Sequence, residues 1–378
     1  MPLVMLFFKF LFNGIKYRFY RLTGCFILPQ ALSIEITRRC IARCLMCNIW
    51  KTPPGTLELT IEEWLNLMLS SALKDLREID VTGGEPFLRK DLVTFLRGIF
   101  DIKNTNLKKL RSISITTNGF LTDKIISVIS QILPKAKDKN IEIVIVFAMD
   151  GIGFVHDEIR RVKGGWQRVD KSIQEMKKFK KLYNNLILGL KTTILPINIV
   201  ELFNIVNYAM ENDLFTIISP FIITKNRYDN TELKSLLQFS ADDIQEILKF
   251  YSNDLFKWDY HRKMLFSFFQ TGNVKKPCSA GFNYFFIRSN GDLFPCPLIY
   301  DYLGNIKEAS FDDLINSDKA VNFRKKIKTY KECMSCTEPG LERYALSFEG
   351  FQILRLLFTI GIKRFINFYI HMGLKKYE

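Results

Sequence analysis

Short apolar runs alternate with segments of helical periodicity from about residue 32 onward. The apolar runs that predict strands are residues 32–37, 77–84, 112–119, 141–151, 185–195 and 215–224. The segments between them predict helices, and one of these opens at Thr60 and Glu63 in the pattern of a capping box. This alternation is typical of βα units around a parallel sheet. It predicts most of a TIM-type barrel or an open doubly wound sheet, with the functional loops at the carboxyl ends of the strands.

The two ends of the chain, residues 1–30 and 341–378, have an amphipathic helical pattern of their own. One face of the first carries Val4, Phe7, Phe8, Leu11, Ile15, Phe19 and Leu22, and the other carries Lys9, Asn13, Lys16 and Tyr20. In the second, Leu354, Leu357, Phe358, Phe365 and Phe368 oppose Gln352, Arg355, Thr359 and Lys363. Neither stretch reaches the roughly 20 uninterrupted apolar residues of a membrane span. Two interpretations stay open: the helices dock on the protein's own core, or they lie in an anionic membrane surface.

The composition is that of a folded protein, because the 378 residues are 48% hydrophobic and 25% charged. The net charge of +15 would suit a nucleic-acid partner. However, residues 1–30 and residues 351–378 each carry a net charge of +4, so these two stretches hold +8 of that total. Both ends are rich in Phe and Leu, which is unusual for arms that bind nucleic acid. We therefore expect no nucleic-acid partner.

Three cysteines, Cys40, Cys44 and Cys47, follow the first predicted strand with the spacing C-x3-C-x2-C. The start of the chain lacks the features of a signal peptide. The eight cysteines therefore point to a reducing cytoplasm, where metal sites are more common than structural disulfides. A structural zinc site would need a fourth ligand close by. Three thiolates instead suit a 4Fe–4S cluster with one open iron, and this interpretation is favoured over zinc or coincidence.

A second set of four cysteines lies near the end of the chain. Cys278 and Cys296 flank Gly291 in the spacing C-x12-G-x4-C, and Cys333 and Cys336 follow as C-x2-C. The stretch "NYFFIRSNGDLFPC" between the first two predicts a β-hairpin with an Asn-Gly turn. Four thiolates make a complete site, for which a zinc ribbon is one interpretation.

Four motifs at the predicted strand ends resemble the radical S-adenosylmethionine (radical SAM) superfamily. They are "CIARCLMC" (40–47), "GGEP" (83–86), "TTNG" (116–119) and "MDG…HDEIRRVKGGW" (149–166). The resemblance covers roughly residues 30–230 and implies a partial (β/α)6 TIM-type barrel. The second cysteine set looks like the twitch appendage, a shortened relative of the SPASM domain with one auxiliary 4Fe–4S cluster. The implied organisation is a core over 31–230, a helical connector over 231–275 and a cysteine-rich domain over 276–340.

This resemblance implies a mechanism. Cys40, Cys44 and Cys47 would bind three irons, and S-adenosylmethionine would chelate the fourth. Reductive cleavage, with an electron from a donor such as flavodoxin or ferredoxin, would give a 5′-deoxyadenosyl radical that abstracts hydrogen from an unactivated C–H bond. The auxiliary cluster, with four thiolates, would be closed and suited to electron transfer. Cys25 is left over, and we expect it to be a buried or membrane-proximal thiol.

The resemblance also implies a cofactor pocket. Its residues would be Met46, Gly83, Gly84, Glu85, Thr117, Asn118, Asp150, Thr193 and Asn198. Glycine lets the backbone approach the ammonium group of the cofactor closely. Glu85 would accept from the cofactor or cap the following helix, and the first role is favoured. Met46 would lie near the adenine, with core packing as the alternative.

The end of the fourth predicted strand departs from the family pattern. The family often has Ser-x-Asp-Gly, whereas this chain has Ala148 in place of the serine, so the ribose contact of that hydroxyl is not assigned here. Asp150 would shape the turn or contact the ribose less directly. His156 and Arg160 would contact substrate or form a structural ion pair.

The substrate class stays open between a lipid or lipid-linked molecule, a peptide or protein, and a small metabolite or sugar. The amphipathic ends favour the first and allow peripheral contact with the inner face of the membrane. Only about 30 residues precede the core, so no separate peptide-recognition domain is expected there, which lowers the case for a peptide maturase. The alternative from another class is a non-catalytic iron–sulfur or zinc protein, but "GGEP" and "TTNG" would then have no purpose at strand ends.

Overall fold

All six predicted strands are present in the computed structural model, which describes residues 3–53, 55–253, 259–274 and 276–377. Parts of the predicted terminal and connector segments, residues 1–2, 254–258, 275 and 378, lie outside the described residues. The strands pair in parallel and in chain order. They are β1 (Ala31–Thr37), β2 (Glu78–Gly83), β3 (Ser112–Thr117), β4 (Glu142–Ala148), β5 (Leu186–Ile194) and β6 (Phe215–Pro220).

The two faces of this sheet differ in polarity. Ile34, Ile79 and Ile113 are fully buried in the apolar core on one face. On the other face Asp80 accepts hydrogen bonds from Ser33 at 2.8 Å and Ser114 at 2.7 Å, its partners in register on the neighbouring strands. Because side chains alternate along a strand, the sequence places one apolar and one polar face on the same sheet.

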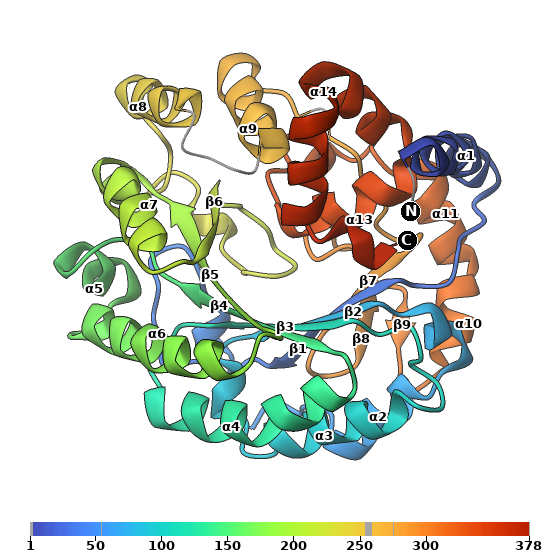
Figure 1. Ribbon diagram of the computed structural model, residues 1–378, viewed down its shortest axis with the longest axis horizontal. Helices are drawn as coiled ribbons and strands as arrows, with labels where there is room; N and C mark the ends of the chain where they lie inside the picture. The colour runs from blue at the N-terminus through green and yellow to red at the C-terminus, as the bar shows by residue number, and fades with distance from the viewer. Residues whose placement is uncertain (1–2, 54, 254–258, 275, 378) are drawn as a thin grey trace.

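Helices cover the apolar face on the outside of the curved sheet (Figure 1). They are α2 (Ile61–Met68), α3 (Leu92–Ile102), α4 (Thr122–Asp138), α6 (Gly165–Leu182) and α7 (Leu202–Glu211), with the short α5 (Phe154–Arg160) after β4. The predicted capping box at Thr60 and Glu63 is present at the start of α2. The result is an open, partial barrel, as expected.

The predicted hairpin is present but does not form a sheet of its own. β7 (Tyr284–Ile287) pairs in antiparallel fashion with β8 (Asp292–Phe294), and β8 pairs with β9 (Gly304–Asn305). β7 also pairs in parallel with β1, so the cysteine-rich segment extends the core sheet to the order β6-β5-β4-β3-β2-β1-β7-β8-β9. This long-range pairing leaves no local sequence signal.

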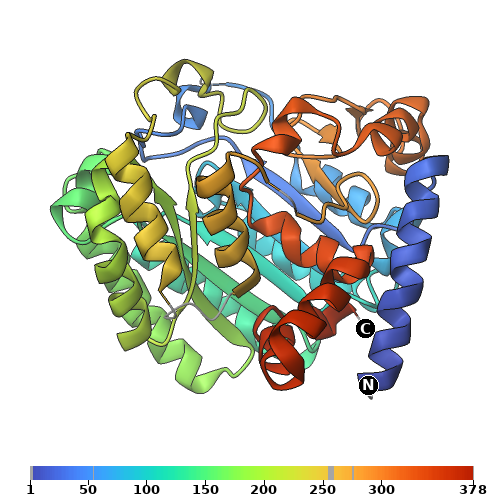
Figure 2. The ribbon, with the colours of Figure 1, turned by 90° about the horizontal axis from the view of Figure 1, so that it is seen from above.

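The remaining helices lie on the inner side of the sheet and around its β6 and β9 edges. They are α8 (Ala241–Ser252), α9 (Asp259–Thr271), α10 (Phe311–Asn316), α11 (Asp318–Lys326), α12 (Lys331–Met334), α13 (Gly340–Glu349) and α14 (Phe351–His371). Figures 1 and 2 place α9, α13 and α14 across the inner side, with the N-terminal helix α1 (Leu3–Thr23) beside α13 and α14. A polar cavity therefore remains between the sheet and the C-terminal helices.

The two terminal helices pack on the protein, α14 largely through its predicted apolar face and α1 through a different one. α1 uses Leu6, Phe10 and Tyr17 for this contact, whereas its predicted apolar face points outward. α14 buries most of its predicted apolar face and is bent at Gly361, whose φ of 75° is not helical. In the described part of the chain, no single helix meets the length and hydropathy of a membrane span; only α13 and α14 together do, and they are bent by 96°.

Candidate active site

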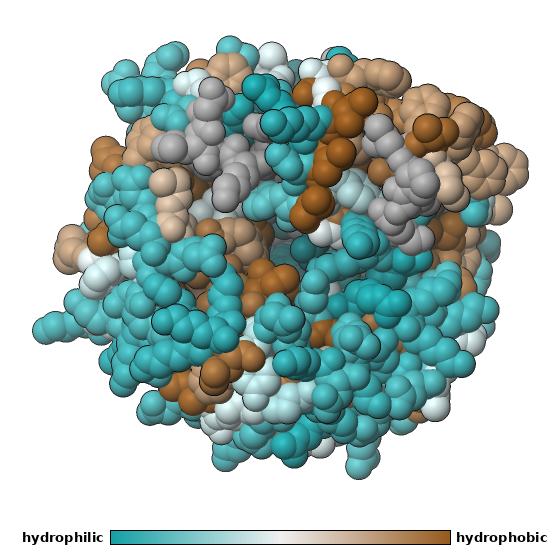
Figure 3. Space-filling model, viewed as in Figure 1, coloured by the Kyte–Doolittle hydropathy of each residue, from teal (hydrophilic) through white to brown (hydrophobic). Residues whose placement is uncertain are grey.

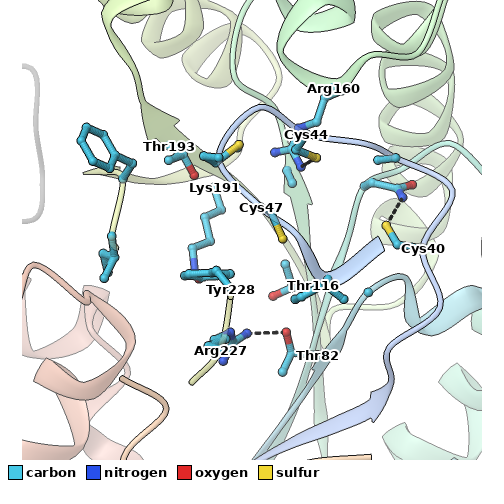
Figure 4. A pocket seen from close by; sticks show the side chains of 18 of the residues that line it. Cys40, Cys44, Cys47, Thr82, Thr116, Arg160, Lys191, Thr193, Arg227 and Tyr228 are labelled. Atoms are coloured by element: carbon cyan, nitrogen blue, oxygen red, sulfur yellow. Dashed lines mark hydrogen bonds between the residues drawn. The ribbon is translucent and has the colours of Figure 1, made fainter. Parts of the chain in front are cut away.

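The three clustered thiols line one cavity at the carboxyl ends of the parallel strands. Cys40, Cys44 and Cys47 lie on the loop after β1, and the ends of β2, β3, β4 and β5 contribute the facing wall (Figure 4). The cavity has a volume of about 150 Å³. All three cysteines are free thiols. The sequence-based placement of this loop at the functional edge of the sheet is therefore consistent with the structure.

Backbone hydrogen bonds hold the cysteine loop between two neighbouring elements. The Arg43 N–H donates to the carbonyl of Arg160 at 3.1 Å, at the end of α5. On the other side, the Asn48 N–H donates to the carbonyl of Tyr228 at 3.0 Å, in the loop after β6. The side chain of Asn230 donates to the Met46 carbonyl at 2.8 Å. The positions of the thiols thus depend on the first, fourth and sixth strand ends together.

The two glycines of "GGEP" line the cavity where β2 meets the cysteine loop. A Cβ on Gly83, whose φ is +151°, would lie 2.2 Å from the Thr37 carbonyl oxygen, and a Cβ on Gly84 would lie 2.3 Å from that of Arg39. The Gly84 N–H donates to the Thr37 carbonyl at 2.8 Å. Glycine is required because two backbones approach each other closely, and this contact leaves the opposite side of β2 bare toward the cavity.

Glu85 is fully buried and does not line the cavity. Its carboxylate accepts from the N–H groups of Phe87 at 3.1 Å and Asn118 at 2.7 Å and from the Thr117 hydroxyl at 2.8 Å. Burial raises its pKa to about 7 although these hydrogen bonds favour the charged form. The alternative role is the one observed, because Glu85 caps the short helix Pro86–Leu88 and fixes the end of β3; its cofactor contact stays a prediction.

Thr117 and Asn118 both line the cavity, as predicted. The Thr117 hydroxyl is engaged by Glu85, while the Asn118 amide faces Cys40, with Nδ2 4.0 Å from Sγ (Figure 4). Met46 also lines the cavity and packs against Ile159, so its packing role is observed and its place near the adenine stays a prediction.

Asp150 and Arg160 form a buried ion pair behind the cysteine loop. The guanidinium Nη2 lies 2.6 Å from Asp150 Oδ2, and Nη1 lies 3.4 Å from the Cys44 sulfur. Of the two sequence-based roles for Arg160, the structural ion pair is the one observed. His156 is also fully buried, and its Nδ1 accepts from the Asp150 N–H at 3.2 Å. Burial and the nearby Arg160 lower the pKa of His156 to about 3, so this ring is neutral.

Asp150 and Asn198 lie beneath the cavity rather than on its wall. Asp150 Oδ1 accepts from the Thr193 N–H at 2.8 Å, and the Asn198 amide donates to the carbonyls of Asp150 at 2.7 Å and Thr193 at 2.9 Å. Both side chains therefore hold the ends of β4 and β5 together through these hydrogen bonds. Their expected cofactor contacts stay predictions. Thr193 itself lines the cavity.

Three charged side chains on the cavity wall were missed by the sequence reasoning. Lys191 on β5, Arg227 after β6 and Glu338 after the last cysteine all line it. Arg227 donates to the Thr82 hydroxyl at 2.7 Å (Figure 4). Burial lowers the pKa of Lys191, but the nearby Glu338 carboxylate outweighs it, so the pKa of Lys191 is raised overall. Burial raises the pKa of Glu338, but Lys191 and Arg227 outweigh it, so the pKa of Glu338 is lowered overall. The sequence held one signal for this group, the carboxylate of Glu338 two residues after the last cysteine ligand candidate, Cys336.

A second cavity, of about 360 Å³, shares part of this wall. Lys191, Arg227 and Glu338 line both cavities, and Asp80 and Glu142 add carboxylates from the polar face of the sheet. Residues Ile370–Gly373 at the end of α14 line the second cavity from the opposite side. The two cavities thus meet at a cluster of buried charges inside the partial barrel.

The four cysteines of the C-terminal set, Cys278, Cys296, Cys333 and Cys336, line a separate cavity of about 340 Å³. Burial raises the pKa of Cys278 and Cys296, and raises that of Cys333 to about 11. The hydroxyl of Tyr17 on α1 donates to the Cys278 carbonyl at 2.5 Å. Cys25, in contrast, is exposed on the chain segment after α1. The N-terminal helix therefore supports the second cysteine set directly.

The donor chemistry of both cysteine sets fits a cluster better than a single ion. Burial and the neighbouring Cys44 raise the pKa of Cys40 to about 12, and the same two causes raise that of Cys47 to about 12, so bound metal is needed to stabilise the thiolates. Among the described residues, no three His, Cys, Asp or Glu side chains converge on a point that suits one metal ion. Tetrahedral zinc requires such convergence, whereas in a 4Fe–4S cluster each thiolate binds a different iron.

Comparison with family models gives two matches. The model of the radical SAM superfamily matches residues 34–203. The model of SPASM, an iron–sulfur cluster-binding domain, matches residues 278–337. The first range contains the three-cysteine loop and the strand-end motifs, and the second contains all four cysteines of the C-terminal set.

Curated relatives match over different lengths. The sporulation killing factor maturation protein SkfB of Bacillus subtilis is 23% identical over 316 residues, which cover 80% of this chain and 69% of SkfB. A GTP 3′,8-cyclase of Campylobacter jejuni is 39% identical over 94 residues. This second match covers 24% of this chain and 28% of the cyclase, so the chain aligns with little more than a quarter of that relative.

Solved structures share the fold at low sequence identity. Streptococcus suis SuiB bound to S-adenosylmethionine superposes with a TM-score of 0.59 and 16% identity, covering 85% of this chain and 73% of SuiB. Native anSMEcpe with bound AdoMet and the Cp18Cys peptide gives a TM-score of 0.56 and 18% identity, covering 90% of this chain and 98% of anSMEcpe.

Proposed function

Because the chain belongs to the radical SAM superfamily and carries a C-terminal SPASM domain, we propose that it is an enzyme that abstracts hydrogen from a C–H bond of a peptide. The observation that carries the proposal is that three partly buried thiols share one cavity at the strand ends with Lys191, Arg227 and Glu338. The superfamily binds a 4Fe–4S cluster and S-adenosylmethionine in its core, and the SPASM domain adds auxiliary iron–sulfur chemistry.

Cys40, Cys44 and Cys47 would hold the core cluster, and the rest of the cavity wall would hold S-adenosylmethionine. The bare backbone of Gly83 and Gly84 suits the amino-acid end of the cofactor, and the apolar side chain of Met46 suits the adenine. Reduced by a donor such as flavodoxin or ferredoxin, the cluster with its bound cofactor supplies the 5′-deoxyadenosyl radical for hydrogen abstraction.

The charges of this chain support that arrangement. The Arg160 guanidinium, 3.4 Å from the Cys44 sulfur, stabilises the thiolate form, and Asp150 fixes the guanidinium in place. Cys278, Cys296, Cys333 and Cys336 would hold the auxiliary cluster.

The peptide assignment has two supports. One is the resemblance over most of the chain to SkfB, which is described as a maturation protein for a killing factor. The other is the wall shared by the two cavities, where Lys191 and Arg227 offer donors and Glu338 offers an acceptor to a peptide backbone or its charged groups. A lipid-linked substrate is the second candidate, and the outward apolar face of α1 favours it.

Anaerobic reconstitution followed by cofactor turnover tests the enzyme assignment. We expect about eight irons per chain, since two 4Fe–4S clusters are proposed, and reductant-dependent formation of 5′-deoxyadenosine. Cys40→Ala should remove this activity and about half of the iron. The matched control is Cys25→Ala, which changes an exposed thiol outside both sets and should leave activity and iron unchanged. Finding zinc at both sites and no cleavage of S-adenosylmethionine would contradict the proposal.

The substrate assignment needs a separate measurement. Peptide and lipid extracts from cells that hold the wild-type gene or the Cys40→Ala gene should differ in the peptide fraction by a mass change. A difference confined to the lipid fraction would replace the peptide by the second candidate and leave the radical SAM assignment intact.

A further inference from the structure

α1 is apolar on two sides, and only one of them packs on the protein. Leu6, Phe10 and Tyr17 are 6%, 2% and 1% exposed against the C-terminal helices and the second cysteine site. The outward side chains are Val4, Met5, Phe8, Phe12, Ile15, Phe19 and Leu22, each more than half exposed. Such a row of large apolar side chains is unusual for a surface that meets only water.

The kinked helix α14 continues this apolar surface. Phe7 of α1 contacts Phe358 of α14 with their ring centroids 6.2 Å apart, and Phe358 is 74% exposed. Beyond the bend at Gly361, Ile362, Ile366 and Ile370 follow one another at helical spacing on the exposed side. Figure 3 shows apolar side chains gathered over the region where Figure 1 labels α1 and α14. We call the outward side chains of α1, together with Phe358, Ile362, Ile366 and Ile370, the terminal apolar face.

The charges on the two helices of this face are all positive, and one of them, Arg18, is paired with Glu349 of α13 at 3.6 Å. Neither α1 nor α14 contains an Asp or Glu, whereas Arg18 on α1 and Arg355, Lys363 and Arg364 on α14 are exposed. An apolar helix surface bordered by basic side chains is the pattern of helices that lie in an anionic lipid interface. A second copy of this chain would bring two such positive surfaces together, which disfavours self-association through this face.

We propose that the terminal apolar face docks this protein on an anionic membrane surface, with α1 lying in the interface and Lys363 and Arg364 meeting lipid headgroups. This inference concerns where the protein acts and does not depend on which substrate it modifies. It has one consequence for the catalytic cavity. Ile370 belongs to the terminal apolar face and also lines the second cavity, so docking brings the rim of that cavity to the membrane.

Co-sedimentation of the reconstituted full-length protein with vesicles tests the proposal. Vesicles of phosphatidylcholine with phosphatidylglycerol should bind the protein, and vesicles of phosphatidylcholine alone should bind it several-fold more weakly, since each basic side chain contributes about 1 kcal/mol near an anionic surface. Replacing Phe8 and Phe12 together by Ser should weaken binding roughly tenfold or more, because two exposed rings leave the interface. Lys363→Gln with Arg364→Gln should weaken binding to the anionic vesicles alone.

The matched control is Phe154→Ser, which removes an equally exposed ring (76%) on α5, away from the terminal apolar face. It should bind vesicles like the wild type. Iron content and cofactor cleavage without substrate should be unchanged in all these variants, which separates this test from that of the proposed function. The proposal is overturned if the wild type does not bind anionic vesicles or if Phe8 and Phe12 are no more sensitive than Phe154. A dimer in solution that the Phe8 and Phe12 changes dissociate would also overturn it.

Discussion

The two cysteine sites are built in different ways. The three-thiol site comes from one loop, with Cys40 to Cys47 inside eight consecutive positions held by α5 and by the loop after β6. The four-thiol site joins a hairpin and a late C-x2-C, and it is braced by Tyr17 from the far N-terminus. The first lines a cavity of about 150 Å³ together with charged side chains of the neighbouring strands, whereas the second surrounds its own cavity with four thiols. Ligand number and surroundings thus separate a site for chemistry from a site for a closed cluster.

Removing one thiol from the four-thiol site should separate the properties of the two cysteine sites most clearly. Cys296 is the most buried of that set, and Cys296→Ala should cost about half of about eight irons, because one iron of the cluster loses its thiolate where no cofactor is proposed to replace it. Cofactor cleavage with reductant should persist, because the three-thiol loop keeps all of its contacts. Iron analysis and 5′-deoxyadenosine formation measure the two effects.

The reverse pattern is the expected result for Cys40→Ala, which leaves the four-thiol site complete. If Cys296→Ala instead removed cofactor cleavage together with its iron, the two sites would be one functional unit and the comparison would fail.

Glu338 is where the two sites meet. It follows Cys336 by two residues and lies among Lys191 and Arg227 on the wall of the three-thiol cavity. Glu338→Gln removes the carboxylate that offsets the charge of these two half-buried cations, so the free energy of unfolding should fall by about 2 kcal/mol, less than for a buried ion pair in direct contact. Urea denaturation measures this change. Glu246→Gln, which removes an exposed carboxylate paired with Lys249 on α8, is the matched control and should have a much smaller effect. Equal losses would mean that Glu338 does not couple the sites.

Local patterns predicted much of the fold. The six parallel strands, the capping box at Thr60 and the hairpin follow from short-range signals, and all are present. The pairing of β7 with β1 could not be predicted, because it joins segments whose own patterns are equally compatible with an isolated hairpin. The position of Lys191 on the cavity wall could not be predicted either. In the sequence it is one polar residue on a strand, and its environment depends on Glu338 from the distant C-terminal segment.

The outward direction of α1 illustrates the same limit. Its sequence is apolar on two faces, and periodicity alone selected the face that turns out to be exposed. What decides the packing side is Gly14, where the ring of Phe351 fits only because no Cβ is present. Likewise the motif "GGEP" located the functional edge correctly, but only the three hydrogen bonds to Glu85 show that its carboxylate is structural.

The smallest expected effect concerns acid, and it reports on the ion pair behind the three-thiol site. The pKa of His156 is about 3 in the folded protein and 6.5 in its ordinary state, so between these values the unfolded chain binds a proton that the folded protein does not. Stability contributed by neutral His156 is therefore fully present above pH 6.5 and is lost as the pH falls toward 3, at up to about 1.4 kcal/mol per pH unit. His156→Gln keeps an acceptor for the Asp150 N–H but cannot titrate, so its unfolding free energy should fall less steeply between pH 7 and pH 5 than that of the wild type. Parallel slopes for the two proteins would place the acid sensitivity elsewhere and remove His156 from the support of Asp150 and Arg160.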